Sequence, residues 1–199
     1  MSITHLDGFA LLEKSWMAAE RIRDRCRRFA AAMDAAGVPY AVIGGNAVGL
    51  WVASRDEDAV RNTKDVDVLL RRSDLDAAKA AGAAAGFLHA TAGAEQVHFF
   101  LDGPNGSFKN GVHVIFAGEK VKPDDPAEAP DVTDSEIVGE MRVLRLEALV
   151  RMKLTAHRLH DRVHVADMMG VGLIDGTWPA RYPPALAARL QAILDNPNG

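Results

Sequence analysis

The sequence has almost no cysteine. Cys26 is the only one among 199 residues, and a single cysteine cannot form an internal disulfide. This excludes a disulfide-stapled scaffold and fits a reducing compartment. Long apolar runs are also missing, since no stretch reaches the roughly 18 residues of a membrane-spanning helix. The N-terminal region carries Asp7 and Glu13 and shows no signal-peptide pattern, so we expect a cytoplasmic protein.

A surplus of basic residues is missing too. Lys and Arg number 23 against 27 Asp and Glu, which gives a net charge of −4. A dedicated nucleic-acid-binding surface usually shows an excess of cations. The charge balance therefore argues against a simple nucleic-acid clamp, although it leaves room for an enzyme with a local basic patch. The sequence also lacks a Walker-type phosphate loop, a dinucleotide-binding glycine fingerprint and a serine nucleophile elbow.

The 199 residues fit one domain, or one domain with a small appendage. Apolar residues spaced three to four apart predict helices, at residues 9–36, 46–53, 73–85, 147–159, 161–169 and 185–194. Short apolar or alternating runs predict strands, at residues 40–43, 65–70, 87–90, 97–101 and 112–116. The segment 122–134 is rich in Pro and Asp without periodicity, which indicates a surface connection.

This order of elements is typical of an α/β or α+β core followed by a helical cap. We place the core, with its N-terminal helix, in residues 1–145 and the cap in residues 146–199. The three tryptophans Trp16, Trp51 and Trp178 are expected in the core. The arginine cluster at residues 21–28 lies largely off the apolar stripe of its helix and is expected to be solvated, with a strip for RNA or a nucleotide as the alternative.

The most informative segment begins where a strand meets a glycine pair. Gly44 and Gly45 directly follow the apolar run 40–43, and a helix opens at Asn46. The first turn of a helix has free backbone N–H groups and the positive end of the helix dipole. Glycines allow a phosphate to approach such a turn closely. The alternative is an ordinary tight turn between a strand and a helix.

Two carboxylates follow at a spacing that places them on one face. Asp65 and Asp67 lie two residues apart in a predicted strand, so both side chains point to the same side. Neighbouring carboxylates repel each other unless a cation lies between them. Oxygen ligands in an open site suit Mg²⁺ with a nucleotide phosphate. The alternative is a solvated pair at the end of a strand.

Together, the segments 43–45 and 63–68 resemble the signature of the polymerase-β-like nucleotidyltransferase superfamily. That signature is a hydrophobic-Gly-Gly/Ser turn followed by a strand with Asp-x-Asp/Glu. The spacing Arg-x-Thr-x-Asp-x-Asp at 61–67 is most similar to the minimal bacterial branch, which includes abortive-infection toxin nucleotidyltransferases. The run 149–154, with Arg158 and Asp161 after it, is similar to the lysine helix and the downstream Arg/Lys-Asp motif of that branch. The resemblance spans roughly residues 38–169.

The resemblance implies a nucleotidyltransferase-like mixed sheet flanked by helices, with a C-terminal helical cap. It also implies a Mg²⁺-dependent enzyme that moves a nucleoside monophosphate from a nucleoside triphosphate to a hydroxyl acceptor. Asp65 and Asp67 would be both catalytic residues and metal ligands. The nucleotide would be bound by the set Gly44, Gly45, Asn46, Thr63 and Lys153. Arg55 or Arg61 could assist from the loop.

One position departs from the family pattern. A third carboxylate is expected on a later strand, and the matching run 112–116 carries His113 there. Asp102 and Glu119 are close in sequence, but neither is placed in the middle of a strand. His113 either replaces the third acid as base or ligand, or marks impaired catalysis, or is structural. A neutral imidazole accepts protons near pH 7, so the exchange is compatible with activity.

Three functions remain open at this stage. The first is nucleotidyl transfer to an RNA such as tRNA or to a protein. The second is a weakened nucleotidyltransferase fold that binds a nucleotide, an RNA or a protein partner. The third is transfer to a small molecule such as an aminoglycoside-like antibiotic. A toxin or antitoxin role depends on genomic neighbours. His160 and His164 have zinc-helix spacing without an obvious third ligand, and ordinary helix histidines are the favoured interpretation.

Overall fold

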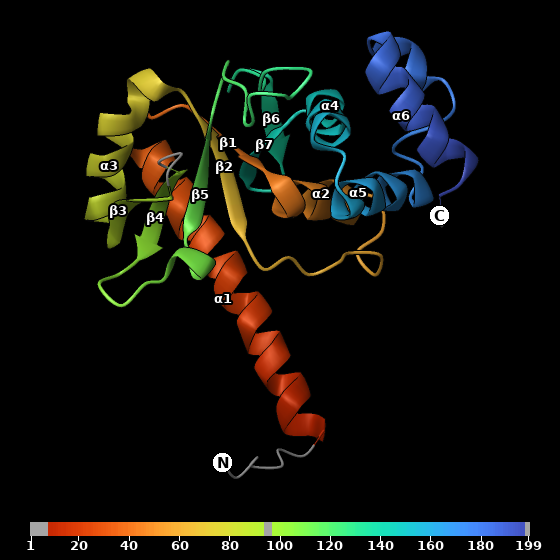
Figure 1. Cartoon of the computed structure of the whole chain (residues 1–199). Helices are drawn as coiled ribbons and strands as arrows, with labels where there is room; N and C mark the ends of the chain where they lie inside the picture. Colours follow the sequence, from red (N-terminus) through yellow and green to blue (C-terminus); the bar gives the residue numbers. More distant parts are fainter. Residues whose placement is uncertain (1–7, 94–96, 198–199) are drawn as a thin grey trace.

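The computed structural model describes residues 8–93 and 97–197. Residues 1–7, with Asp7, and 94–96 of the predicted core lie outside the described residues, as do residues 198–199 of the predicted cap. Seven strands form one mixed sheet in the order β3-β4-β5-β2-β1-β7-β6 (Figure 1). The strands are β1 (Tyr40–Ile43), β2 (Val66–Leu70), β3 (Phe87–Ala92), β4 (Val97–Asp102), β5 (Val112–Phe116), β6 (Ser135–Val138) and β7 (Met141–Leu144). The β2–β5 and β1–β7 pairs are parallel, and the other neighbours are antiparallel.

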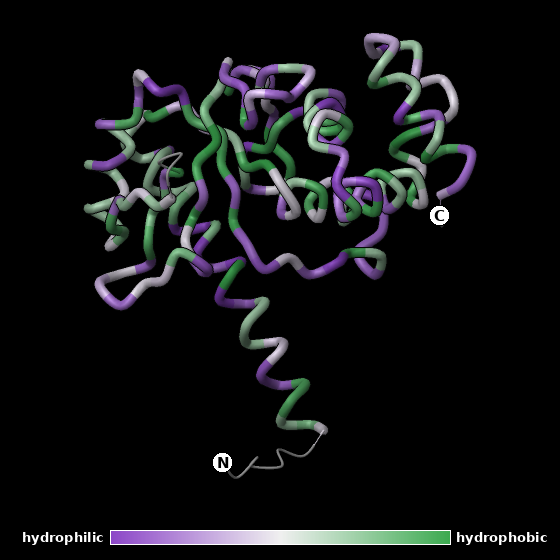
Figure 2. Tube along the Cα trace, in the orientation of Figure 1, coloured by the Kyte–Doolittle hydropathy of each residue, from purple (hydrophilic) through white to green (hydrophobic). Residues whose placement is uncertain are grey.

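Helices cover both faces of the sheet (Figure 1). They are α1 (Gly8–Ala35), α2 (Gly44–Ala53), α3 (Leu75–Ala84), α4 (Leu146–Ala156), α5 (Leu159–Gly170) and α6 (Pro184–Asp195). Helices α1 and α3 pack on one face, where Phe29 of α1 meets the rings of Phe87 and Phe100 at 5.5 and 4.9 Å. Helices α2, α4 and α5 contact one another on the other face, and α6 packs on α4 and α5. The apolar strands between these layers form the centre of the core (Figure 2).

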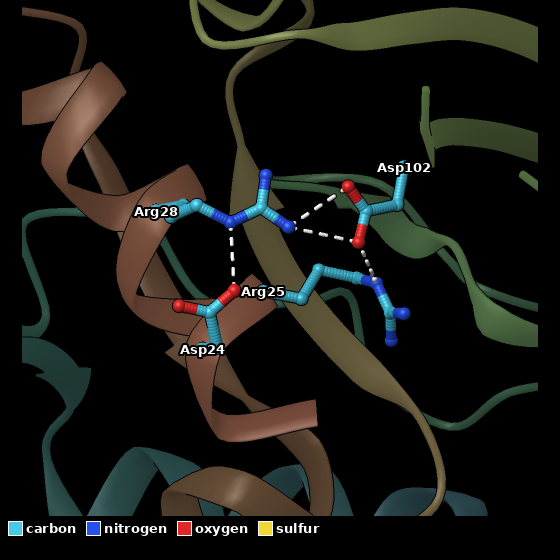
Figure 3. Close-up of polar contacts among 4 residues, drawn as sticks. All are labelled: Asp24, Arg25, Arg28 and Asp102. Carbon is cyan, nitrogen blue, oxygen red and sulfur yellow. Dashed lines mark hydrogen bonds and ion pairs between the residues drawn. The ribbon is translucent and has the colours of Figure 1, made fainter. Parts of the chain in front are cut away.

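An ion-pair cluster fixes α1 to the end of β4 (Figure 3). Both carboxylate oxygens of Asp102 accept hydrogen bonds from Nη2 of Arg28 at 2.8 Å, and Oδ2 also accepts one from Nε of Arg25 at 3.2 Å. Burial alone would raise the pKa of Asp102, but the two guanidinium groups outweigh it and hold that pKa below its usual value. Two arginines of the predicted solvated cluster are therefore structural.

The first half of α1 projects beyond the sheet, as Figure 1 shows. It carries large exposed apolar side chains, among them Phe9, Leu12 and Trp16. Figure 2 shows several green, hydrophobic positions along this part of the helix. Trp16 is 67% exposed, so its predicted place in the core is wrong. The apolar period of the helix continues past the edge of the sheet, where nothing in the described chain covers it. Trp178 is buried as predicted, and the half-buried Trp51 donates to the carbonyl of Leu144 at 3.0 Å.

The hairpin of β6 and β7 is the largest feature that the sequence analysis missed. Its two strands flank the two-residue turn Gly139-Glu140, and Gly139 has a φ of +63°. A glycine at the first central position is typical of a tight hairpin turn. The signal was present as two apolar runs separated by two residues. Strand β7 pairs with β1 and makes β1 an interior strand of the sheet.

The other predicted helices and strands match the structure within a few residues. Their apolar residues recur at the period of the element and face the core in the structure. The predicted division at residue 145 stays a prediction.

Arg189 of α6 caps the end of α4 by donating to the carbonyls of Leu154 and Thr155 at 2.7 and 2.9 Å. No helix in the described ranges is both long and apolar enough to cross a bilayer.

The two halves of α1 should differ sharply in their contribution to stability. Phe29 is fully buried, and Phe29→Ala should lower the free energy of unfolding by about 3–5 kcal/mol. Trp16→Ala, a truncation of similar size on the same helix, should change it by less than about 0.5 kcal/mol. Urea denaturation at several protein concentrations measures both. A larger loss for Trp16→Ala would show that the projecting half of α1 is packed against something in solution.

Candidate active site

Four residues form one row across the sheet. The strand register pairs Ile43 of β1 with Asp67 of β2, Asp67 with His113 of β5, and His113 with Phe99 of β4. Directly paired residues of neighbouring strands point to the same face. The row lies on the face opposite α1 and lines a cavity of about 340 Å³. Three strands thus bring Asp67, His113 and Phe99 together from positions up to 46 residues apart.

Asp67 and His113 contact each other directly. Nδ1 of His113 lies 3.1 Å from Oδ1 of Asp67, and the two side chains are 32% and 26% exposed. An ionised carboxylate only accepts hydrogen bonds, so Nδ1 is the nitrogen that donates to Asp67, and in the neutral imidazole Nε2 is the nitrogen with the lone pair. The ring of Phe99 is stacked on the imidazole at 5.1 Å and 18°. The histidine is held on one side by a carboxylate and on the other by a ring.

The glycine pair leaves room that side chains would fill. Gly44 has a φ of +68°, and a Cβ atom built there would lie 2.1 Å from Oδ2 of Asp67. A Cβ atom at Gly45 would lie 2.7 Å from Oγ1 of Thr63. Gly44 is therefore required by its backbone conformation and by its neighbour. Because glycine has no side chain, the backbone at Gly44 lies directly against the carboxylate of Asp67, which is a predicted metal ligand.

Helix α2 begins at Gly44, two residues earlier than predicted, so both glycines belong to its first turn. No side chain caps this end, and the N–H groups of a first turn have no partner within the helix. Asn46 does not line the cavity. Its Nδ2 donates to the backbone carbonyl of Asp65 at 2.7 Å and so ties the helix to the loop before β2. Asn46 thus positions Asp65, and only its backbone is available to a phosphate.

Asp65 lies just before β2, is exposed, and lines the same cavity as Asp67. Thr63 also lines the cavity and donates from Oγ1 to the carbonyl of Asp65 at 3.4 Å. In the described part of the chain no cluster of three or more His, Cys, Asp or Glu forms a closed metal cage. Two carboxylates beside bare glycines form an open site, which fits an ion that takes its remaining oxygens from a phosphate and water.

The opposite wall of the cavity holds a buried charge cluster. Asp161 of α5 is 1% exposed and accepts from Nζ of Lys153 at 3.1 Å and from Nε of Arg158 at 2.8 Å. Burial raises the pKa of Asp161, but the Arg158 hydrogen bond and the Lys153 charge outweigh it, so its pKa lies below the usual value. Asp161 also accepts from the backbone N–H of Arg158, which caps α5. Two cations share one carboxylate, so the cluster keeps a positive charge next to the cavity.

Other predicted residues lie elsewhere. The guanidinium of Arg61 binds the carboxylate of Asp167 on α5 at 2.8 and 2.9 Å, and the exposed Arg55 does not line the cavity. Glu119 forms a two-point ion pair with Arg72. Asp102 is bound by α1 (Figure 3). Neither of these two carboxylates reaches His113, so His113 alone occupies the third position of the row.

Several walls of the cavity come from residues without a predicted role in a site. Part of the segment 122–134 lines the cavity through Lys122, Asp125 and residues 127–129, so it is more than a surface connection. Phe99 and Phe108, whose rings contact each other edge-on, also line the cavity. His164 of α5 also faces the cavity, and its buried Nδ1 has no hydrogen-bond partner among the described residues. No local pattern marks Phe99, Phe108 or the segment 122–129 as part of a cavity, and the zinc-helix spacing of His164 does not point to it either, because only the packing of distant segments brings these residues together.

Comparisons with known proteins place the fold. No protein-family model and no curated protein sequence matches this chain. A crystal structure of an H. pylori protein described as a nucleotidyltransferase aligns with 90% of this chain and 78% of that chain, at a TM-score of 0.51 and 12% identity. The crystal structure of ANT(2″)-Ia in complex with adenylyl-2″-tobramycin aligns with 83% of this chain and 94% of that chain, at a TM-score of 0.50 and 14% identity. The chain therefore has the α/β fold of nucleotidyltransferases, as the sequence resemblance predicted.

His164 should make stability depend on pH. Burial, and then the charge of Lys153, lowers the pKa of its imidazole to about 4, whereas an unfolded histidine titrates near about 6.5. Between these values the unfolded chain binds more protons, so stability that is present above pH 6.5 is lost as the pH falls towards 4. From pH 7 to pH 5, the loss from His164 should be about 2 kcal/mol.

Urea denaturation at both pH values checks this. His164→Gln should show a correspondingly smaller loss between pH 7 and pH 5 than the wild type. Leu159→Ala, a change at an exposed side chain of the same helix that carries no titratable group, should keep the wild-type loss. Equal pH dependence in the wild type and His164→Gln would contradict the burial of a neutral imidazole.

Proposed function

We propose that this protein is a Mg²⁺-dependent nucleotidyltransferase that moves a nucleoside monophosphate from a nucleoside triphosphate to a hydroxyl acceptor. The observation that carries the proposal is the contact between Gly44 and Asp67. Bare backbone at a helix start lies against a carboxylate, so that a phosphate and a metal ion could meet there. The fold of the chain supports the same class of reaction.

The triphosphate would lie along the start of α2. The N–H groups of Gly44 and Gly45 point their dipoles at the approaching phosphate, and neither residue has a side chain in the way. Lys153 and Arg158 supply positive charge from the other wall. Because Asp161 already holds both cations in place, they lose little side-chain entropy when a phosphate binds. This cluster therefore acts as a preorganised counter-charge.

Asp65 and Asp67 are the residues that would hold the metal. Asp65 is exposed, and Oδ2 of Asp67 is turned towards Gly44 while Oδ1 contacts His113. A bound Mg²⁺ supplies neutralisation of the triphosphate and stabilisation of the departing pyrophosphate. Asn46 and Thr63 fix the backbone carbonyl of Asp65, which sets the direction of its carboxylate.

His113 would accept the proton of the acceptor hydroxyl. Its Nδ1–H is bound to Asp67, so Nε2 is the free proton acceptor. The negative charge of Asp67 stabilises the imidazolium that forms, in the way a carboxylate supports a histidine base. The alternative function is a weakened scaffold that binds a nucleotide, an RNA or a protein, and the replacement of the expected third carboxylate by His113 is the observation that favours it.

Removing either carboxylate should strongly weaken metal-dependent nucleotide binding. Asp65→Asn and Asp67→Asn should each weaken the affinity for Mg–ATP, or for the preferred one of the four triphosphates, at least about tenfold, since each removes a charged oxygen ligand. Calorimetry with and without Mg²⁺ measures this. Glu136→Gln, which removes one exposed carboxylate on β6, is the control and should bind normally. Equal affinities in all four proteins would rule out the metal site.

His113 separates the enzyme from the scaffold. His113→Ala should leave Mg–NTP affinity unchanged and slow transfer of label from an α-labelled triphosphate to cellular RNA, protein or small molecules by about 10²–10⁴. His113→Asp should restore activity, because it supplies the carboxylate that the family pattern places there. An inert wild type with an active His113→Asp variant would establish the scaffold function. Full activity of His113→Ala would show that His113 is structural.

A further inference from the structure

The imidazole of His164 lies beside the start of α2. Helix α5, which carries this histidine, packs on α2 (Figure 1). Cε1 of His164 lies 3.6 Å from the point where Gly45 would carry a Cβ atom, and both residues line the cavity. A phosphate bound at the backbone of Gly45 would therefore lie next to this imidazole.

The two ring nitrogens of His164 have different surroundings. Nδ1 is buried and has no hydrogen-bond partner among the described residues. Nε2 has no partner in the described ranges either, but it is not buried. A neutral imidazole carries one proton, and an N–H that reaches solvent costs less than a buried N–H without an acceptor. Nε2–H is therefore the donor that this side chain offers to the cavity.

Burial keeps this donor neutral. Burial, and then the charge of Lys153, lowers the pKa of His164 to about 4, and His160 acts in the same direction. Asp161 and Asp167 act in the opposite direction, and the lowering causes outweigh them. At pH 7 His164 therefore adds a hydrogen bond, and no charge, to a group that binds beside it.

Other side-chain donors beside Gly45 already have partners. Oγ1 of Thr63 and Nδ2 of Asn46 both donate to the backbone carbonyl of Asp65. They position the loop before β2, as described above. His164 thus supplies a donor at this end of the cavity that the fold itself does not use.

We propose that Nε2–H of His164 donates a hydrogen bond to the terminal phosphate of the bound triphosphate. The assignment rests on the proposed function, which places the triphosphate along the start of α2. His113 contacts Asp67, and Asp67 lies against Gly44, whereas His164 lies beside Gly45. The phosphate at His164 is thus the one farther from the acceptor hydroxyl. His164 therefore holds the part of the substrate that departs as pyrophosphate.

Calorimetric binding of two probes, Mg–ATP and Mg–tripolyphosphate, tests this contact without catalysis. His164→Phe keeps a ring of similar size and removes the N–H, so it should weaken the affinity for both probes about three- to tenfold, the effect of one neutral hydrogen bond. The loss should persist at pH 8, where an imidazole is neutral. His164→Gln retains a donor and should bind more tightly than His164→Phe. His164→Ala removes the ring as well and should show at least the same loss, which provides a second variant if the phenylalanine ring prevents folding.

His89→Phe is the matched control, because it makes the same exchange at a half-buried histidine of β3 that does not line the cavity. It should bind both probes like the wild type. Wild-type affinity in His164→Phe would overturn the proposal, because a ring that only fills space is preserved in that variant. A loss confined to Mg–ATP would place His164 at the nucleoside and overturn it too, as would a loss confined to pH values below about 6.5.

Asp65→Asn, measured alongside, separates this contact from the proposed transferase site. Binding that depends on Asp65 and not on His164 refutes the imidazole contact alone. A His164 effect on both probes without dependence on Mg²⁺ or Asp65 supports the contact and contradicts the proposed metal site. Absence of binding of either probe to the wild type refutes both.

Discussion

The carboxylate of Asp67 is the constraint on which the whole site depends. One oxygen occupies the space where Gly44 would carry a Cβ atom, and the other accepts from His113. Any side chain at Gly44 would displace Asp67 and break the contact with the histidine. The turn, the strand and the next strand are therefore coupled through a single side chain. Asp67 is irreplaceable because α2, β2 and β5 all meet at its side chain.

A second carboxylate, Asp161, organises the other half of the cavity. Burying it would be costly on its own, and the cost is offset by two cations and the backbone N–H that it accepts from. The same side chain starts α5 and holds Lys153 towards the cavity. The pair of Arg61 and Asp167 adds a link between α5 and the loop before β2. The cap helices thus contribute charge to the site and also hold the loop that carries Asp65.

His113 alters the chemistry that the row can perform. A carboxylate in its place would add a third negative charge next to Asp65 and Asp67, whereas a neutral imidazole adds none. In the proposed reaction, Asp65 and Asp67 would hold the cation, and His113 would be a separate proton acceptor. Stacking on Phe99 fixes the imidazole plane, so the direction of its free nitrogen is set by the sheet. Binding of the metal and acceptance of the proton are assigned to different residues.

The sequence by itself determined most of the elements, and it singled out Gly44, Gly45, Asp65 and Asp67, which line one cavity in the fold. Periodicity located helices and strands, and the glycine pair with Asp65 and Asp67 indicated the cavity, because a turn and a two-residue spacing are local properties. Local signals missed the β6–β7 hairpin, whose strands are short, and misplaced Trp16, whose apolar stripe extends past the sheet.

Only the tertiary structure decided which distant residues meet. In the sequence, Glu119 and Asp102 lie as close as His113 to the expected third carboxylate. In the fold, Arg28 of α1 binds Asp102, and Arg72 of the turn before α3 binds Glu119, so neither reaches the row. Phe99 and Phe108 line the cavity without any motif, and His164 lines it although its spacing pattern suggested only an ordinary helix histidine, because strand register and helix packing placed them there. Register is set by the burial of whole strand faces and not by single residues, so it cannot be read from a local pattern.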